Sequence, residues 1–331
     1  MKKGLWRMAI IRCLEYSITF FIILVINFFL PRLLPGGPLA LESNADTGSM
    51  VALTPQTRLQ LLQYYHLNEP LPMQFVSYLV DTAKLNFGYS IYYNMPVTSL
   101  IIGRLPWTIL LMGSAMIIST IIGIYLGMES AWKPGDLLDR ALLTIMPVIK
   151  SIPVFFLGTM MLFVLGYHYN LFPTSGGMTL YGVYGSPLDE VADIVSHLAL
   201  PLVCLTLFDV TGTYLLVRNF CIQQRESPYV LMAEARGLDE ETIKKHILRN
   251  SLTPIITRIG ATLGFLIGGA TFIETIFAYP GMGLLIYNSF FNRDYPVIQA
   301  AFLIMALSVL GCNLLADIIC TIIDGRERSR S

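Results

Sequence analysis

The sequence predicts an all-α, polytopic membrane protein with six transmembrane helices and a small external helical segment after the first span. Three observations support this fold class. Hydrophobic residues make up 54% of the 331 positions and charged residues 13%, about half of the charged fraction of an average soluble protein, and the mean hydropathy is +0.62. Six segments are apolar enough and long enough to cross a bilayer. Lys and Arg residues gather on alternate connections between these segments.

Each predicted span contains about 20 or more mostly apolar residues, the length that a transmembrane helix needs. The spans are residues 8–30, 106–128, 141–166, 198–217, 255–277 and 297–323. The first follows Lys2, Lys3 and Arg7 as a signal peptide would, but its apolar run is too long and no small-residue cleavage motif follows it. We therefore interpret it as an uncleaved anchor.

The distribution of basic residues predicts that both termini face the cytoplasm. Lys and Arg are concentrated at the N-terminus, in the second-to-third and fourth-to-fifth connections and in the C-terminal tail. The other face holds fewer of them: Arg32, Arg58, Lys84, Arg104 and Arg293. Because cytoplasmic loops carry the excess of Lys and Arg, the chain is expected to start and end on the cytoplasmic side.

These spans divide the chain into four parts. Residues 1–34 form an N-terminal tail and the first span, 35–105 an external segment, 106–323 the core transmembrane domain with a cytoplasmic loop at 218–254, and 324–331 a cytoplasmic tail. Within the external segment, the patterns of residues 56–67 and 70–85 predict two amphipathic helices. The second external loop, residues 167–197, contains no Lys or Arg and is expected to be irregular.

The most informative stretch is the cytoplasmic connection between the fourth and fifth spans. Ser227-Pro228 has the pattern of a helix start, and Gly237 that of a helix end. Three acidic residues at 239–241 then predict the start of a second short helix, with its basic residues toward the other end. Pro254 marks the entry to the fifth span. A helix, a glycine turn and a second helix therefore project into the cytosol, where another protein could bind them.

This connection, YVLMAEARGLDEETIKKHILRNSLTP at 229–254, resembles the cytoplasmic coupling motif of ABC importer permeases of the dipeptide, oligopeptide and nickel branch. Further segments resemble the same branch in the same order along the chain: LNEPLPMQFVSYL at 67–79, LNFGYS at 85–90, RLPWT at 104–108, SIPVFFLG at 151–158, LFPTSGG at 171–177, HLALP at 197–201, FIETIFAYPGMG at 272–283 and NRDYPVIQA at 292–300. The long external segment after the first span resembles that of the first-type permease subunit.

The resemblance implies an ABC importer type I permease fold in the inner membrane of a prokaryote. It also implies a second homologous permease subunit, two ABC ATPase subunits that use ATP and Mg, an external solute-binding protein and surrounding membrane lipid as partners. The implied ATPase-coupling residues are Tyr229, Ala233, Glu234, Ala235, Arg236, Gly237 and Leu238. The implied substrate is a small peptide, with a nickel chelate or another small solute as the alternative.

Several absences and departures accompany this resemblance. The chain has no phosphate-binding GxxxxGK[ST] motif, so ATP hydrolysis is assigned to the partner subunits and the chain itself is expected to be a non-catalytic subunit without a cofactor. A net charge of zero gives no indication of nucleic-acid binding. Met232 and Glu234 replace the Thr and Arg often found in the coupling motif, and Lys150 and Asp209 are not expected in spans of this family.

Polar groups inside the predicted spans are candidates for the translocation path or its gate. They are Lys150, Asp209, Glu274, Pro280, Gly281 and Asp317. Glu274 and Asp317 have a structural role at the gate or a helix interface as an equal alternative. Lys150 lies between Pro147 and Pro153, which predict a kink or break there. Its expected partner is Asp209, Asp317 or a substrate carboxylate; the alternative is that it extends to the interface.

Two other classes of protein remain open from the sequence alone. Charges inside the spans would suit an ion-coupled secondary transporter, although no inverted repeat is visible; a membrane scaffold is the third class. Three scattered histidines, His66, His168 and His197, could suggest nickel, but they lack metal-ligand spacing, so no metal site is predicted.

Overall fold

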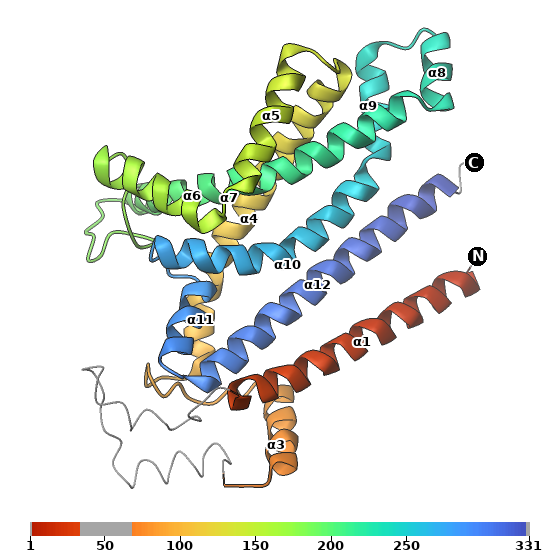
Figure 1. Ribbon diagram of the computed structural model, residues 1–331. Coiled ribbons are helices and arrows are strands. Elements are labelled where there is room, and N and C mark those ends of the chain that lie inside the picture. The colour runs from red at the N-terminus through yellow and green to blue at the C-terminus, as the bar shows by residue number, and fades with distance from the viewer. Residues whose placement is uncertain (1, 34–67, 329–331) are drawn as a thin grey trace. The chain divides into compact units, whose positions relative to one another are not determined.

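The computed structural model describes residues 2–33 and 68–328. These residues form helices joined by turns and irregular connections, with one isolated β-bridge between Tyr89 and Pro96 (Figure 1). Among the described residues, three helices are long and apolar enough to cross a membrane on their own. They are α4 (Val97–Trp132), α7 (Pro187–Arg225) and α12 (Tyr295–Arg328), the last through its stretch Tyr295–Cys320. The all-helical fold class is therefore confirmed among the described residues.

The predicted third span is one broken helix. Helix α5 (Leu137–Ser151) ends at Ile152, and α6 (Val154–Met161) continues at an angle of 95° before the π-helical turn η2 (Leu162–His168). Pro153 lies at the break and Pro147 inside α5; a proline lacks the N–H that the preceding turn needs. The break expected beside Lys150 is thus confirmed. If α5 and the α6–η2 segment are counted together as one broken span, four spans among the described residues are long and apolar enough to cross a membrane.

Helices α1 (Lys2–Leu33) and α10 (Leu252–Ile276) coincide with the predicted first and fifth spans. Of α1, the stretch Leu14–Phe29 qualifies as a shorter apolar helix. Among the described residues, the full count of six spans is therefore not established by length and composition.

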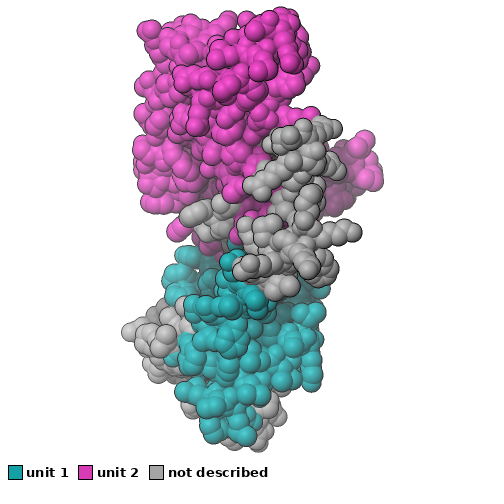
Figure 2. All heavy atoms as spheres, turned by 90° about the vertical axis from the view of Figure 1, so that its right-hand side faces the viewer, with its two compact units in different colours: residues 1–104, 285–310 teal, residues 105–284, 311–331 magenta. Residues whose placement is uncertain are grey.

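The chain divides into two compact units, shown in teal and magenta in Figure 2. The first contains Met1–Arg104 and Leu285–Leu310, and the second contains Leu105–Leu284 and Gly311–Ser331. Each unit combines segments that are far apart in the sequence.

In the first unit, α1 packs on α3 (Leu71–Ala83) through an aromatic cluster. Phe28 is fully buried, and its ring centroid lies 5.1 Å from that of Phe75 and 5.6 Å from that of Tyr78. Helix α3 confirms the helix predicted at 70–85; the one predicted at 56–67 lies outside the described residues.

Two of the segments that resemble the permease branch meet in this same unit. The carboxylate of Asp294 accepts hydrogen bonds from the Ser90 hydroxyl at 2.5 Å and from the backbone N–H groups of Ile91 and Tyr92 at 3.3 Å. Asp294 is completely buried. The turn after α3 is therefore tied to the start of α12, about two hundred residues later in the chain.

In the second unit, α4 approaches α7 closely because glycines face it. A Cβ on Gly123 would lie 2.6 Å from Thr213 Cβ, and one on Gly127 would lie 2.8 Å from Val217 Cβ. Side chains of α4, α6, α7 and α10 complete an apolar core around Leu111, Leu205 and Phe277. This core joins four helices, and α7 contributes Leu198, Leu200, Cys204 and Leu205 to it.

Two features of the fold were not predicted from the sequence. The predicted irregular loop at 167–197 ends earlier, because α7 begins at Pro187 with Ser186 as its N-cap; the expectation of an irregular 187–197 was wrong. The sequence analysis also missed the short helix α11 (Met282–Phe291), which follows α10 after a tight turn.

Candidate functional site

The predicted cytoplasmic helix is α8 (Pro228–Ala235), which has Ser227 at its N-cap position and Pro228 as its first residue. The Ser227 hydroxyl donates to the Gln224 carbonyl rather than capping α8. At the other end, Gly237 has a φ of +73°. Its N–H bonds to the Glu234 carbonyl at 2.9 Å, and the Leu238 N–H bonds to the Ala233 carbonyl at 3.2 Å. This pair of bonds is a Schellman motif, which favours glycine at the left-handed position.

The second predicted helix is α9 (Glu240–Asn250), with Asp239 as its N-cap. The Asp239 carboxylate accepts hydrogen bonds from the Thr242 hydroxyl at 2.6 Å and from the Thr242 N–H at 3.3 Å. The hydroxyl bond is the larger of these effects, and together they lower the pKa of Asp239 below its ordinary value. Figure 1 shows α8 and α9 as a helical pair beyond the end of α7. Both helix starts and the glycine stop agree with the sequence prediction.

An apolar cluster attaches this pair to the membrane helices. Val230 of α8 and Ile243 and Ile247 of α9 are buried against Val217 and Cys221 of α7. Burial of large aliphatic side chains contributes about 1.5–3 kcal/mol each. The pair is therefore fixed to α7 by its buried base.

Polar contacts attach the same pair to the last turn of α4. The Trp132 indole N–H donates to Glu240 at 3.0 Å, and the Lys244 ammonium lies 3.0 Å from the Glu129 carboxylate. Arg225 of α7 donates to the Trp132 carbonyl at 2.8 Å, and its guanidinium carbon lies 4.7 Å from the Trp132 ring centroid. The Trp132 side chain is thus in contact with α7 and α9 together.

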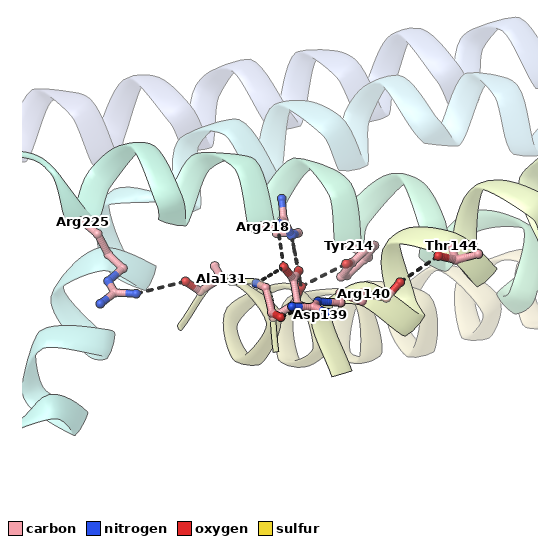
Figure 3. A network of polar contacts seen from close by, with 9 residues as sticks. Ala131, Asp139, Arg140, Thr144, Tyr214, Arg218 and Arg225 are labelled. Carbon is pink, nitrogen blue, oxygen red and sulfur yellow. Dashed lines mark hydrogen bonds and ion pairs between the residues drawn. The ribbon is translucent and has the colours of Figure 1, made fainter. Parts of the chain in front are cut away.

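A largely buried ion pair joins Arg218 of α7 to Asp139 of α5 (Figure 3). Arg218 donates from Nε to one oxygen of Asp139 at 2.6 Å and from Nη2 to the other at 2.9 Å. The Ser130 hydroxyl donates to the same carboxylate, and the Gly135 N–H reaches it at 2.8 Å. Tyr214 Oη lies 3.0 Å from Ser130 Oγ. This network joins α4, α5 and α7 directly before the segment that leads to α8.

The sequence analysis missed this network. Its only visible signal was a pair of opposite charges at the ends of neighbouring predicted spans, Asp139 before the third and Arg218 after the fourth. Such charges are common near span ends, so this signal alone does not indicate a contact.

The outward face of α8 and its glycine turn is apolar. Leu231 is 57% exposed, Met232 58% and Leu238 38%. Of the predicted coupling residues, Tyr229 and Ala233 are half-buried at the base, whereas 234–238 are exposed. A cluster of apolar side chains on a short helix, surrounded by charged residues, is typical of a protein-binding surface.

The predicted path residues do not form one site. Glu274, Pro280 and Gly281 lie together at the turn between α10 and α11. Glu274 is completely buried, and its carboxyl group accepts hydrogen bonds from the Thr108 hydroxyl at 2.7 Å and the Gly283 N–H at 2.6 Å. It therefore satisfies the first N–H groups of α11. A Cβ on Gly281 would lie 2.2 Å from the Glu274 carboxyl oxygen, which explains the glycine there.

Asp209 is paired, but not with Lys150. Its Oδ1 lies 3.0 Å from Arg258 Nη2, and its Oδ2 accepts from the Ser119 hydroxyl at 2.7 Å. Lys150 is exposed and instead donates to the Phe208 carbonyl at 3.4 Å, with its ammonium 3.5 Å from the Phe208 ring centroid. Of the partners expected for Lys150, Asp209 is therefore corrected: the basic residue of α10, not that of α5, neutralises Asp209.

Asp317 lies on α12 and is partly exposed. Across 2–33 and 68–328, no group of three or more His, Cys, Asp or Glu side chains is arranged to hold a metal ion. His168 contacts Tyr169, and His197 contacts Asp193, while His66 lies outside the described residues.

Comparison with known proteins identifies the family of this chain. A family model described as the binding-protein-dependent transport system inner membrane component matches residues 119–329. The chain is 34% identical to the dipeptide transport system permease protein of Lactococcus lactis subsp. cremoris (strain MG1363), over 94% of this chain and 95% of that protein.

Two further relatives cover nearly the same length. The oligopeptide transport system permease protein of Bacillus subtilis (strain 168) is 34% identical over 92% of this chain and 93% of its own. The dipeptide transport system permease protein of Escherichia coli (strain K12) is 28% identical over 94% and 96%. The matches cover the α8–α9 pair and the membrane helices on both sides of it.

Proposed function

Since this chain belongs to the family of binding-protein-dependent transport system inner membrane components, we propose that it is the first-type permease subunit of an ABC importer for small peptides. In this proposal α1 and α10 complete the six spans, and both termini lie in the cytoplasm. The chain forms half of the translocation path, and a second permease subunit of similar fold forms the other half.

The observation that carries the proposal is the α8–α9 pair. Its apolar tip, formed by Leu231, Met232 and Leu238, is exposed, whereas its base is buried against α7. An exposed apolar tip on a rigidly held base suits a helix that inserts into the cleft of an ATPase subunit. The relatives named as peptide permeases support peptides as the substrate class.

The contacts at the base suggest how a movement would be transmitted. Closure of the two ATPase subunits on ATP would displace α8. Lys244 ties α9 to the last turn of α4, and Arg225 ties the end of α7 to the same turn. Because Arg218 also ties α7 to the start of α5, the displacement would pass to α4, α5 and α7 together. The pore then changes between two discrete arrangements, as in other domain-rotation switches.

An external solute-binding protein would deliver the peptide to the opposite face. The irregular connection between η2 and α7 carries highly exposed apolar side chains there, including Val183 and Tyr181. This arrangement supports a docking surface for that partner.

Replacement of Leu231 by Asp tests the proposal. A charge in the centre of the tip should prevent burial in the ATPase cleft, because an unpaired buried charge is strongly unfavourable. We expect the ATPase subunits to be lost when the tagged permease is purified from membranes. Leu180→Asp is the matched control, since Leu180 is an exposed leucine of the connection after η2. Retention of the ATPases by Leu231→Asp would contradict the proposal.

A further inference from the structure

A cavity of about 370 Å³ lies within the first unit, between α1, α3 and the first turns of α12. Its volume is at the lower end of the range for small-ligand pockets. Hydroxyl and amide groups dominate the lining, together with one basic and one acidic side chain, Arg32 and Asp81. The polar neutral side chains of the lining are those of Gln74, Ser77, Tyr78, Thr82, Asn86 and Gln299. The proposed transport function does not use this cavity.

Arg32 is held in a fixed position at the cavity. Its Nη2 and Nε donate to Gln74 Oε1 at 2.9 and 3.3 Å, and its Nη1 donates to the Phe28 carbonyl at 2.7 Å. Gln74 is itself buried, and its amide nitrogen donates to the Glu69 carbonyl at 2.8 Å, which fixes the orientation of the amide. Since a guanidinium has five N–H donors, these bonds leave one N–H on each terminal nitrogen of Arg32.

The two charges of the lining are not paired with each other. Among residues 2–33 and 68–328, no ion pair joins Arg32 to a carboxylate or Asp81 to a basic group. The Asp81 carboxylate accepts a 3.4 Å hydrogen bond from the Asn86 side-chain amide. A cavity that presents a cation and an anion separately is complementary to a zwitterion, whose two charges are a few bonds apart.

An exposed apolar face of α1 leads to the same cavity. Ile18, Ile22 and Phe29 are exposed, and at 100° per residue they lie on the same side of the helix as Arg32. At 1.5 Å per residue, the distance from Ile18 to Phe29 is about 16 Å, close to half of the ~30 Å hydrocarbon thickness of a bilayer. One acyl chain of a single leaflet has this reach.

We propose that the cavity binds the headgroup of a phosphatidylethanolamine-type lipid. The phosphate accepts hydrogen bonds from the two remaining N–H groups of Arg32, a geometry that guanidinium groups offer to phosphates. The ammonium lies at Asp81, and one acyl chain runs along the exposed face of α1. The lipid holds the α1–α3 corner in the membrane interface, independently of any transported substrate.

Lipid retention by the intact transporter tests this site. The complex, purified in detergent, is incubated with equimolar phosphatidylethanolamine and phosphatidylglycerol, and bound lipids are identified by native mass spectrometry. We expect the parent to prefer phosphatidylethanolamine. Arg32→Gln should lower retention of both lipids about tenfold, since a hydrogen bond to a charged group is lost. Asp81→Asn should remove only the preference, because both lipids have a phosphate but only one has an ammonium.

Lys84→Gln is the matched control, since Lys84 is an exposed cation just after α3 that does not line the cavity; it should retain lipid as the parent does. Inorganic phosphate and a neutral dipeptide are added in separate samples to compete with the lipid. Equal retention by the parent and Arg32→Gln overturns the proposal. It is also overturned if the dipeptide removes the lipid at millimolar concentration while Asp81→Asn abolishes that competition, which would assign the cavity to a free zwitterionic substrate.

Discussion

Helix α7 takes part in two aspartate–arginine pairs that differ in how completely they are closed. At Asp139, both carboxylate oxygens accept from Arg218, and Ser130 and Gly135 add two further donors. At Asp209, only one oxygen meets Arg258, at 3.0 Å, and the other is occupied by Ser119. Arg258 also remains more exposed than Arg218, at 24% against 13% of the side chain.

This difference indicates two mechanical roles. The bidentate pair fixes the start of α5 to α7, so in the proposed coupling both would follow the α8–α9 pair. The monodentate pair joins α7 to α10 across Gly212, where a Cβ would lie 2.2 Å from Arg258 Nη2, and Arg258 also donates to Thr213 Oγ1 at 3.1 Å and to the Asp209 carbonyl at 3.4 Å. Because only one carboxylate oxygen of Asp209 meets Arg258 and an exposed Lys150 lies at the neighbouring Phe208 carbonyl, we expect this second pair to exchange partners more readily than the first.

The largest effect is expected from Arg218→Met, which breaks the closed pair. Removal of one partner of a buried ion pair leaves an uncompensated charge and costs about 3–5 kcal/mol. The unfolding temperature of the purified chain in detergent should fall sharply. The double variant Arg218→Met with Asp139→Asn should recover most of the loss. An unfolding temperature of Arg218→Met equal to that of the parent would show that the Arg218–Asp139 ion pair does not stabilise the protein.

Arg258→Met should have a smaller effect, about 1–3 kcal/mol, because Asp209 keeps its bond to Ser119 and the pair is partly exposed. Lys150 sharpens the comparison, because its ammonium group donates to the carbonyl of Phe208, the residue directly before Asp209. Lys150→Met should change the unfolding temperature little in the parent and more in the Arg258→Met background. Such non-additivity is the sign of coupled residues; strictly additive effects would exclude an exchange of partners.

Gly237→Val tests the glycine turn between α8 and α9. The site has open space around it but a φ of +73°, so a β-branched residue costs about 1–2 kcal/mol of local strain and misdirects Leu238. We expect a nearly unchanged unfolding temperature together with a loss of transport-coupled ATP hydrolysis. Gly237→Asn is the control, because asparagine tolerates this conformation better. If Val and Asn behave alike, the Schellman turn does not matter for coupling.

The smallest structural effect is expected from two labelling variants. They test on which side of the membrane the α8–α9 pair and the connection after η2 lie. Lys245 on α9 is 78% exposed, and Val183 after η2 is almost fully exposed. A cysteine at Val183 should react with a membrane-impermeant thiol reagent on intact cells, and one at Lys245 only after permeabilisation, with the parent as the background. The opposite pattern would place the α8–α9 pair outside and contradict the coupling role.

The sequence predicted the helical elements best where local chemistry decides them. Pro228, Gly237 and Asp239 each set a helix end through their own backbone or side chain. Helix α8 begins and ends, and α9 begins, where these residues predict. Pro147 and Pro153 likewise predicted the break beside Lys150. These effects act within one turn of helix and are therefore visible in a linear pattern.

Tertiary partners were much less visible. Asp209 was one of the partners expected for Lys150, but the choice among them depends on the rotation of each helix about its axis. Because Gly212 has no side chain, Arg258 has the space to reach Asp209. Helix α11 was missed for a related reason: its N-terminal cap is Glu274, nine residues upstream on another helix, rather than a residue directly before it.

That arrangement has a consequence for biogenesis. The carboxyl group of Glu274 emerges from the ribosome with α10, but two of its donors, the Gly283 and Leu284 N–H groups, belong to the turn that is synthesised next. Release of α10 into lipid before this turn appears would leave an acidic group in hydrocarbon without these two donors, which is costly. The insertion machinery should therefore release α10 and α11 together, as one hairpin, against an α4 that is already in place.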